Sequence, residues 1–370
     1  MTGKRQCGRS RKPVGIVVVG LGGRGSWALE EIQRSDRYTV RGVCDRIPAR
    51  MEFMLKRSGA PQIPAFTDYA DCLRRCDFEA VFVGTHDGGH AEIAVPSLQA
   101  KKYVYLEKPL EITLAGCRAI IAADRRAGGR TFVGHNLRFA PICAEMHRRV
   151  RAGQVGPLLT IEYNEFYDGG RTFFRRWNRL RKFGGGLWLT KACHDFDLLC
   201  WIAGAAPESV YAVNALSWYR PRRGAARYCR DCRFRARCPD AYERFCPPGS
   251  LGWELYRTTE ESTGQKPDLC LYNSAKDTFD HGAVLLRFPG GLTATYTLNV
   301  VAGFTTRQMR VAGPKGALES DHENMRFVFR PRDGGKAETV NLSRISLGGH
   351  GGGDERIFEA FADFLRGDKA

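Results

Sequence analysis

The sequence predicts an α/β protein of two domains: an N-terminal domain built on a parallel sheet, then an α+β domain with a large, mainly antiparallel open sheet. Strand and helix patterns alternate over residues 14–137, as they do in βαβ units. After residue 158, strand patterns follow one another with alternating polarity, which is typical of an antiparallel sheet. A length of 370 residues also fits two domains of ordinary size.

Each expected element follows from a local pattern. Buried strands of the first domain are expected at 14–20, 39–44, 80–83, 103–106 and 131–133. Helices are expected between them, at 24–34, 47–58, 68–75, 90–99 and 114–127. Strands of the second domain are expected at 160–166, 209–218, 283–288, 292–300, 308–312 and 325–329, and an amphipathic helix at 355–365.

The chain divides into three regions on this pattern. Residues 1–13 form a basic tail, residues 14–137 the first domain and residues 138–370 the second. An insertion at 220–275, rich in arginine, proline and tyrosine, interrupts the second domain without clear periodicity.

The most informative motif is a glycine triplet, Gly20-x-Gly22-x-x-Gly25, between the first strand and the first helix. Gly20 permits a tight turn, Gly22 lets the backbone approach a pyrophosphate, and Gly25 allows close packing of helix on strand. Gly23 and Arg24 complete a turn whose amides face the phosphates at a helix N-terminus. The motif predicts a Rossmann domain that binds a dinucleotide.

The second part of this fingerprint is an acidic residue at the end of the next strand. Asp45 stands there, where its carboxylate can accept hydrogen bonds from ribose hydroxyls and repel a 2′-phosphate. NAD is therefore expected, and NADP is the less favoured alternative because the neighbouring Arg46 could pair with that phosphate.

Composition excludes some classes of function. The net charge is +17, but no helix-turn-helix, RNA-recognition or zinc-finger spacing accompanies it, so we expect no nucleic-acid partner. No apolar run approaches the length of a membrane span, so no membrane association is expected. Most of the 13 cysteines are scattered singly, as in proteins of a reducing compartment, which favours the cytoplasm.

Two further motifs identify a family. Glu107-Lys108-Pro109 follows a sheet strand, and the segment Gly184 to Asp197 contains Lys191 and His194. Together with the glycine triplet, they resemble the glucose-fructose oxidoreductase and inositol dehydrogenase family, written Gfo/Idh/MocA. The resemblance implies a dehydrogenase that forms homo-oligomers, dimers or tetramers. It also implies that the nicotinamide side and the domain junction contribute cofactor contacts, here from Thr85, His90, Glu107, Lys108, Asn136 and Arg138.

The resemblance also assigns catalytic roles. Lys108 corresponds to the lysine that contacts nicotinamide and the substrate hydroxyl, and His194 to the proton-accepting histidine. Relatives usually carry an aspartate four residues before that histidine, whereas this chain has Thr190 followed by Lys191. On one continuous helix, Lys191 would lie on the face of His194 and could hold an anionic group of the substrate, or else be a surface lysine.

Other residues around this segment are candidates for substrate binding. Asp197 is the better expected orienter of His194, while Asp195 either binds substrate or lies on the helix surface. Upstream, Trp177 could stack on a sugar ring, and Arg175 or Arg176 could bind its oxygens; packing of the aromatic residues in the core is an equal alternative.

These features predict an NAD-dependent oxidoreductase that removes a hydride from a secondary hydroxyl of a sugar, possibly an acidic one, a glycoside or a cyclitol. One alternative is a glycosidase that oxidises carbon 3 transiently, eliminates the aglycone and reduces the ring again. Another is a noncatalytic NAD sensor, against which the retention of Lys108 and His194 argues.

The insertion carries its own motif, a group of four cysteines in close sequence. Cys229, Cys232, Cys238 and Cys246 could coordinate a structural zinc ion tetrahedrally. An iron-sulfur cluster, free thiols and disulfides are the alternatives.

Overall fold

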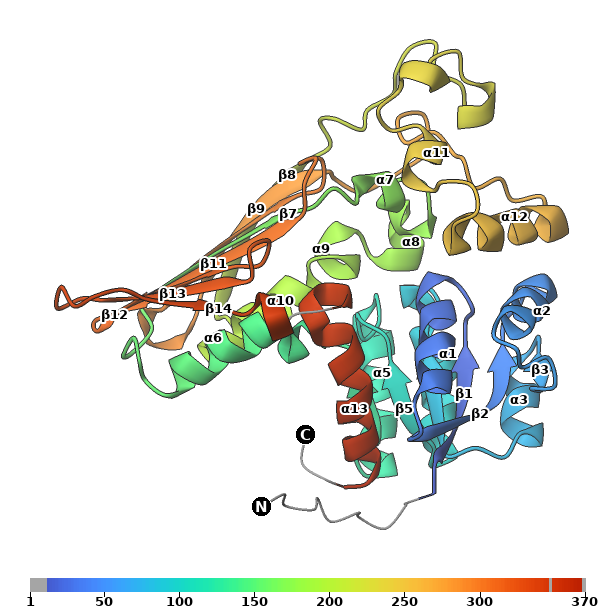
Figure 1. The fold of residues 1–370 in the computed structure, drawn as a ribbon, viewed down its shortest axis with the longest axis horizontal. Helices are drawn as coiled ribbons and strands as arrows, with labels where there is room; N and C mark the ends of the chain where they lie inside the picture. The colour runs from blue at the N-terminus through green and yellow to red at the C-terminus, as the bar shows by residue number, and fades with distance from the viewer. Residues whose placement is uncertain (1–11, 346–347, 368–370) are drawn as a thin grey trace, which may run out of the picture.

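The computed structural model describes residues 12–345 and 348–367, and it shows two domains joined along one side (Figure 1). The first domain is a six-stranded parallel sheet in the order β3-β2-β1-β4-β5-β6. Its strands are β1 Val14–Val19, β2 Tyr38–Cys44, β3 Ala65–Phe66, β4 Ala80–Val83, β5 Tyr103–Leu106 and β6 Thr131–Val133. This is the Rossmann domain that the sequence predicts.

Helices cover both faces of this sheet, so its strands are buried on both sides. They are α1 Gly23–Arg34, α2 Pro48–Arg57, α3 Tyr69–Arg75, α4 His90–Gln99 and α5 Leu114–Ala127. The last helix of the chain, α13 (Gly353–Leu365), returns to the Rossmann domain and packs in the core that α1 and α2 also line. Its Phe358 and Phe361 pack on Tyr105 of β5 at ring distances of 5.3 Å.

The second domain is an open sheet of eight strands in the order β14-β13-β12-β11-β7-β10-β9-β8. All neighbours are antiparallel except β7 and β10. The strands are β7 Thr160–Phe166, β8 Ser209–Ala215, β9 His281–Arg287, β10 Thr293–Asn299, β11 Thr306–Gly313, β12 Gly316–Asp321, β13 Arg326–Pro331 and β14 Glu338–Asn341.

One face of this sheet packs on helices, and the other is largely open to solvent. In β9, buried and exposed residues alternate strictly along the strand, which is the pattern of a half-buried sheet. The packed face meets α6 (Pro141–Arg151), α7 (Gly170–Phe173), α9 (Leu187–Thr190) and α10 (Cys193–Ala203), while α8 (Arg181–Gly184) contacts α9 and residues Asp87–Gly89 of the Rossmann domain. These helices lie between the sheet and the Rossmann domain (Figure 1).

The insertion contains α11 (Tyr242–Phe245) and α12 (Leu251–Thr263) and extends beyond the sheet (Figure 1). Helix α12 packs back on α2 of the Rossmann domain, where Leu255 joins the buried core and Arg50 Nε donates to Thr259 Oγ1 at 2.8 Å. The insertion therefore contacts both domains.

The predicted fold class is confirmed, with local differences. Sequence reasoning missed β3, β12, β14, α6 and α12; α6 begins at Pro141, which a first helical position accepts. Among the described residues, no helix has the length and apolarity needed to cross a bilayer. Most of the predicted basic tail, residues 1–11, lies outside the described residues.

Candidate functional site

The glycine loop leaves an open surface at the start of α1. A Cβ at Gly25 would lie 1.7 Å from the carbonyl oxygen of Gly20, so only glycine fits where helix and strand meet. At Gly22 and Gly23, in contrast, a Cβ would meet no atom within 4 Å among the described residues. The loop is thus tight on its inner side and free on its outer side, next to the helix N-terminus, which suits a pyrophosphate.

Asp45 lies beside this loop at the end of β2. Its carboxylate accepts from the backbone N–H of Leu21 at 2.7 Å and from that of Ile47 at 2.9 Å, and only 8% of the residue is exposed. Arg46 points outward to Glu92 at 3.3 Å, while Arg50 Nη1 lies 3.9 Å from the carboxylate. The predicted ribose ligand is therefore held in place, next to a cation that sequence reasoning missed.

Three expected cofactor residues bind one another through the start of α13. Arg24 Nε donates to Glu107 at 2.9 Å, and its guanidinium lies 3.2 Å from Asp354. Asn136 Nδ2 donates to the same Asp354 at 2.6 Å. These contacts join the glycine loop, the end of β5 and the domain junction, so Arg24, Glu107 and Asn136 hold the shape of the site.

Two more predicted cofactor residues, His90 and Arg138, also have partners inside the protein. His90 is fully buried, with its Nδ1 2.8 Å from the carbonyl oxygen of Pro109, so it supports the turn after β5. Arg138 is exposed and forms a two-pronged ion pair with Asp197 of α10, at 2.6 and 2.7 Å. Thr85 is half-buried at the end of β4.

Lys108 reaches from the Rossmann domain to the second domain. It follows β5, precedes a cis peptide bond to Pro109, and donates from Nζ to the carbonyl oxygen of Thr190 at 2.8 Å. Burial alone would lower the pKa of Lys108, but Cys193, Asp87 and Glu107 raise it above its usual range. The ammonium therefore keeps its proton at neutral pH.

His194, in the first turn of α10, has the opposite electrostatics. It is only 3% exposed, and burial, followed by the charge of Lys108, holds its pKa well below the usual value. Among the described residues its Nδ1 has no hydrogen-bond partner. The site thus places a neutral imidazole within electrostatic reach of a charged ammonium, an arrangement suited to moving a hydroxyl proton.

The surroundings of His194 correct two predictions. The chain is helical to Thr190 and again from Cys193, so Lys191 lies in a break and not on the same helix as His194. Its Nζ is 2.7 Å from Glu165 of β7, and both side chains are buried. Lys191 is therefore neither a surface lysine nor a free cation facing a substrate anion.

Asp195 and Asp197 also differ from expectation. Asp195 is fully buried, where it accepts from Tyr296 Oη at 2.7 Å and from Arg307 Nε at 2.9 Å, so the surface alternative is wrong. Arg307 also pairs with Glu165. Asp197 binds Arg138 and does not orient His194 through any hydrogen bond between described residues.

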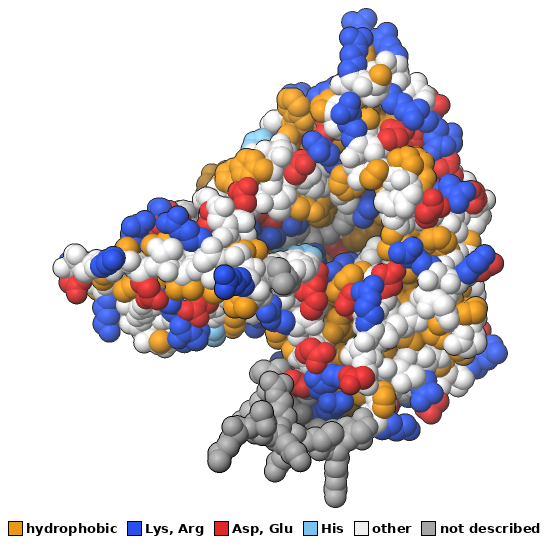
Figure 2. Space-filling model, viewed as in Figure 1, with side chains coloured by type: hydrophobic (Ala, Val, Ile, Leu, Met, Phe, Trp, Pro, Cys, Tyr) orange, Lys and Arg blue, Asp and Glu red, His pale blue; other side chains and the backbone are white. Residues whose placement is uncertain are grey.

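Sequence reasoning missed two polar residues beside Lys108 and His194. Burial raises the pKa of Asp87 to about 7, partly offset by Lys108. The ring of His350 lies 5.6 Å from that of His194, and its Nδ1 is 2.7 Å from Asp354. The glycine-rich sequence around His350 predicts only a loop, and it is the fold that brings this loop next to α10. Figure 2 shows the molecule hollowed between the two domains, with Lys, Arg and His side chains in the hollow.

The upstream aromatic and basic segment borders this region only in part. The ring of Trp177 lies 6.1 Å from that of His86, which neighbours Asp87. Arg176 instead stacks 4.8 Å over the ring of Tyr256 on α12. Arg175 is buried and donates to the carbonyl oxygen of Leu269, 2.7 Å away in the insertion. Trp177 therefore remains a candidate for the wall of the site. Arg175 and Arg176 instead connect this segment of the chain to the insertion.

The predicted zinc tetrad does not come together. Within residues 12–345 and 348–367, no three cysteine, histidine or acidic side chains converge tightly enough to hold a metal ion. Cys246 packs in one buried cluster with Tyr242 and Cys229 and lies 3.9 Å from Ser250 Oγ, but it does not line the cavity that the other three cysteines line.

Comparison with known proteins decides the family. Residues 14–135 match the model of an oxidoreductase family with an NAD-binding Rossmann fold, GFO_IDH_MocA, and residues 143–319 match the GFO/IDH/MocA C-terminal domain. The chain belongs to the Gfo/Idh/MocA family. It is 28% identical over 352 residues to a putative oxidoreductase, YteT, of Bacillus subtilis, covering 88% of this chain and 82% of that one.

The chain is also similar to proteins at lower identity or over a shorter stretch. Myo-inositol 2-dehydrogenase of Thermotoga maritima is 27% identical over 203 residues, which is 54% of this chain and 58% of that protein. Among solved structures, an oxidoreductase domain protein from Kribbella flavida has a TM-score of 0.72 at 19% identity, with 97% and 92% of the two chains covered. A levoglucosan dehydrogenase complex with NADH and levoglucosan has a TM-score of 0.71 at 17% identity, with 97% and 91% covered.

This Gfo/Idh/MocA member keeps the motifs but alters one position of its site. Thr190 stands where relatives usually have aspartate, and its hydroxyl accepts from Asn178 Nδ2 at 3.1 Å. Its carbonyl oxygen, which any residue would supply, accepts from Lys108. The substitution thus removes a carboxylate without removing the acceptor that positions Lys108.

Proposed function

We propose that this protein is an NAD-dependent oxidoreductase that removes a hydride from a secondary hydroxyl of a sugar, glycoside or cyclitol. The observation that carries the proposal is the pair formed by Lys108 and His194, whose pKa values shift in opposite directions. The relatives support the substrate class, since they include inositol dehydrogenases and a levoglucosan dehydrogenase.

Each member of the pair has a separate task in this reaction. Bound NAD supplies the hydride acceptor. His194, neutral because of its lowered pKa, accepts the hydroxyl proton as the hydride leaves carbon. Lys108, charged because of its raised pKa, donates a hydrogen bond to the oxygen and stabilises the negative charge that develops there.

The residues around the glycine loop fit NAD. The open side of Gly22 and Gly23 accommodates the pyrophosphate, and Asp45 is oriented toward the loop by two backbone donors. Because Asp45 is fixed and Arg46 points outward, we favour NAD over NADP. Since Lys191 is paired with Glu165, a neutral substrate is favoured over an acidic sugar.

A second candidate is the glycosidase reaction through transient oxidation. It needs a further base, which removes the proton next to the newly formed carbonyl group. Asp87 favours this candidate, because it is buried within electrostatic reach of Lys108 and its pKa of about 7 allows it to gain and lose a proton at neutral pH.

We also propose a homo-oligomer. Tyr211 and Val213 of β8 and Leu285 of β9 share the solvent-facing side of the open sheet, and each is at least half exposed. An exposed apolar patch of this kind is typical of a protein interface.

The test is a screen of glycosides, sugars and cyclitols that records NADH absorbance and aglycone release together. Net NADH formation supports the dehydrogenase, and aglycone release without net NADH supports the glycosidase. On the best substrate, K108A and H194A are each expected to reduce kcat by ~100-fold or more while NAD still binds. K315A and H147A, which lie outside the site, are the matched controls. Normal turnover in either site variant would contradict the proposed roles.

A further inference from the structure

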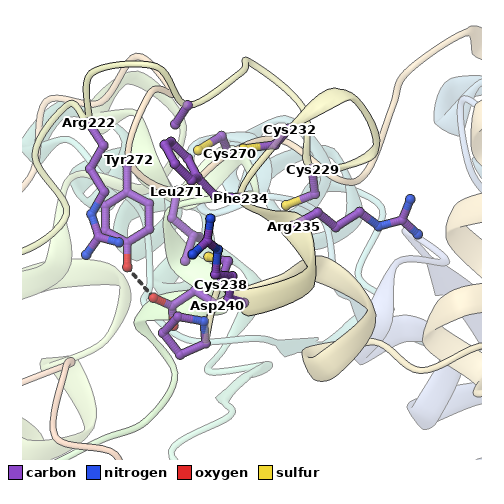
Figure 3. Close-up of a pocket in the computed structure, with 13 residues that line it drawn as sticks. Arg222, Cys229, Cys232, Phe234, Arg235, Cys238, Asp240, Cys270, Leu271 and Tyr272 are labelled. Atoms are coloured by element: carbon purple, nitrogen blue, oxygen red, sulfur yellow. Dashed lines mark hydrogen bonds between the residues drawn. The ribbon is translucent and has the colours of Figure 1, made fainter.

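The insertion contains a cavity that is lined by four cysteines from two separate stretches of chain. Cys229, Cys232 and Cys238 come from the predicted motif, and Cys270 from the end of the insertion (Figure 3). The cavity measures about 210 Å³. We infer that these four thiols, with Cys270 in place of Cys246, bind a thiophilic metal centre, which is either one zinc ion or an iron-sulfur cluster.

The backbone brings the fourth cysteine to the other three. Tyr228 and Leu269 form an isolated antiparallel bridge. Around it, the N–H of Cys229 donates to the carbonyl oxygen of Asp268 and that of Cys270 to Arg227, both at 2.8 Å. This pairing fixes Cys229 and Cys270 on adjacent strands although 41 positions separate them in the sequence.

The first three cysteines are presented by tight turns. The N–H of Cys232 donates to the carbonyl oxygen of Cys229 at 3.1 Å, and the N–H of Cys238 to that of Phe234 at 2.9 Å. These two turns face the segment that carries Cys270, so the thiols lie around a single space, as in small metal-binding modules. The four cysteines line the space without three of them converging on one point, so binding requires inward rotation of the side chains.

The charges around the cavity suit thiolates. Arg175 Nη1 donates to Cys229 Sγ at 3.3 Å in a buried contact. Arg222, Arg235 and Arg237 also line the cavity, against one carboxylate, Asp240. Four thiolates with one divalent ion leave a net charge of about −2, which these guanidinium groups offset.

The position of the centre gives it a structural task. Arg230, between the first two cysteines, pairs with Glu260 of α12 at 2.6 Å, and α12 packs on α2 beside the ribose end of the cofactor site. On the other side, Arg175 connects the cavity to the segment that holds Trp177. A centre here would therefore hold the insertion against both the cofactor side and the substrate side of the site.

The first experiment measures metal and absorption spectrum of the full-length protein purified under reducing, anaerobic conditions. About one zinc per chain, or iron with acid-labile sulfide and visible absorption, supports a thiolate centre and identifies it. C270S is expected to lose the metal, and C246S, the matched control, to keep it. Metal lost in C246S but kept in C270S would overturn the ligand assignment, and wild-type protein without zinc or iron would overturn the centre itself.

A second measurement covers the case in which C270S fails to fold. X-ray absorption of the wild-type protein is expected to show only sulfur ligands, at about 2.3 Å for zinc. Nitrogen or oxygen ligands in the first shell would contradict a centre of four cysteines. Neither experiment depends on substrate, so either can fail while the proposed oxidoreductase activity stands.

Discussion

Asp87 offers a test of the site that needs no substrate. Burial raises its pKa from 3.8 to about 7. Between these values the unfolded chain releases the proton and the folded protein keeps it, so this group makes the folded state less stable as pH rises from about 4 to 7. A shift of about 3 pKa units corresponds to about 4 kcal/mol in total, of which about 2 kcal/mol falls between pH 5 and 7.

Asp87→Asn removes the ionisation and nearly preserves the shape. The free energy of unfolding of the variant, relative to wild type, is expected to rise by about 2 kcal/mol between pH 5 and 7. Urea unfolding at pH 5, 6 and 7 measures this difference, in the transition that includes the Rossmann domain. D36N, at an exposed aspartate, is the control for loss of one charge. If D87N and wild type show the same dependence on pH, Asp87 ionises as an ordinary aspartate and our account of the buried charges around Lys108 is wrong.

Two further substitutions test the cofactor and the buried charges. D45A is expected to weaken binding of NAD much more than that of NADP, because it removes both a ribose acceptor and a repulsive charge; fluorescence titration with both cofactors measures this, and equal losses would reject the assignment. K191M is expected to destabilise the protein by about 1–3 kcal/mol in urea unfolding, because it removes one of the two cations, Lys191 and Arg307, that pair with the buried Glu165. Selective loss of affinity for acidic sugars, with stability unchanged, would instead restore its predicted role as an anion ligand.

The elements that sequence reasoning found are those whose signal is local. Strands β1, β4, β5 and β6 are formed by apolar runs of the sequence. The glycine triplet predicts the close approach between Gly20 and Gly25, which no residue with a side chain allows. The motif residues Asp45, Lys108 and His194 lie at the end of β2, directly after β5 and in the first turn of α10. These features depend on a few neighbouring residues and on one type of secondary structure.

The errors arise where distant segments decide the environment. Lys191 was placed by helical spacing, but the helix breaks at this residue and Glu165, on a strand, pairs with it. Asp195 reads as a surface residue until Tyr296 and Arg307 are brought to it. Cys246 has favourable spacing, yet Cys270 reaches the cavity through strand pairing.

The C-terminal helix illustrates how the two domains share one site. Its sequence follows the second domain, yet Phe358 and Phe361 fill the Rossmann core, so the start of α13 is fixed beside the glycine loop. Asp354 there binds Arg24 from one domain and His350 from the loop next to His194. Because Arg24 is neutralised by Glu107 and Asp354, it contributes little free charge to a pyrophosphate, which must be bound mainly by the amides of the loop. The same contacts connect the glycine loop to His350, whose ring lies 5.6 Å from that of His194, so the last helix of the chain helps to fix the position of His194 relative to the glycine loop.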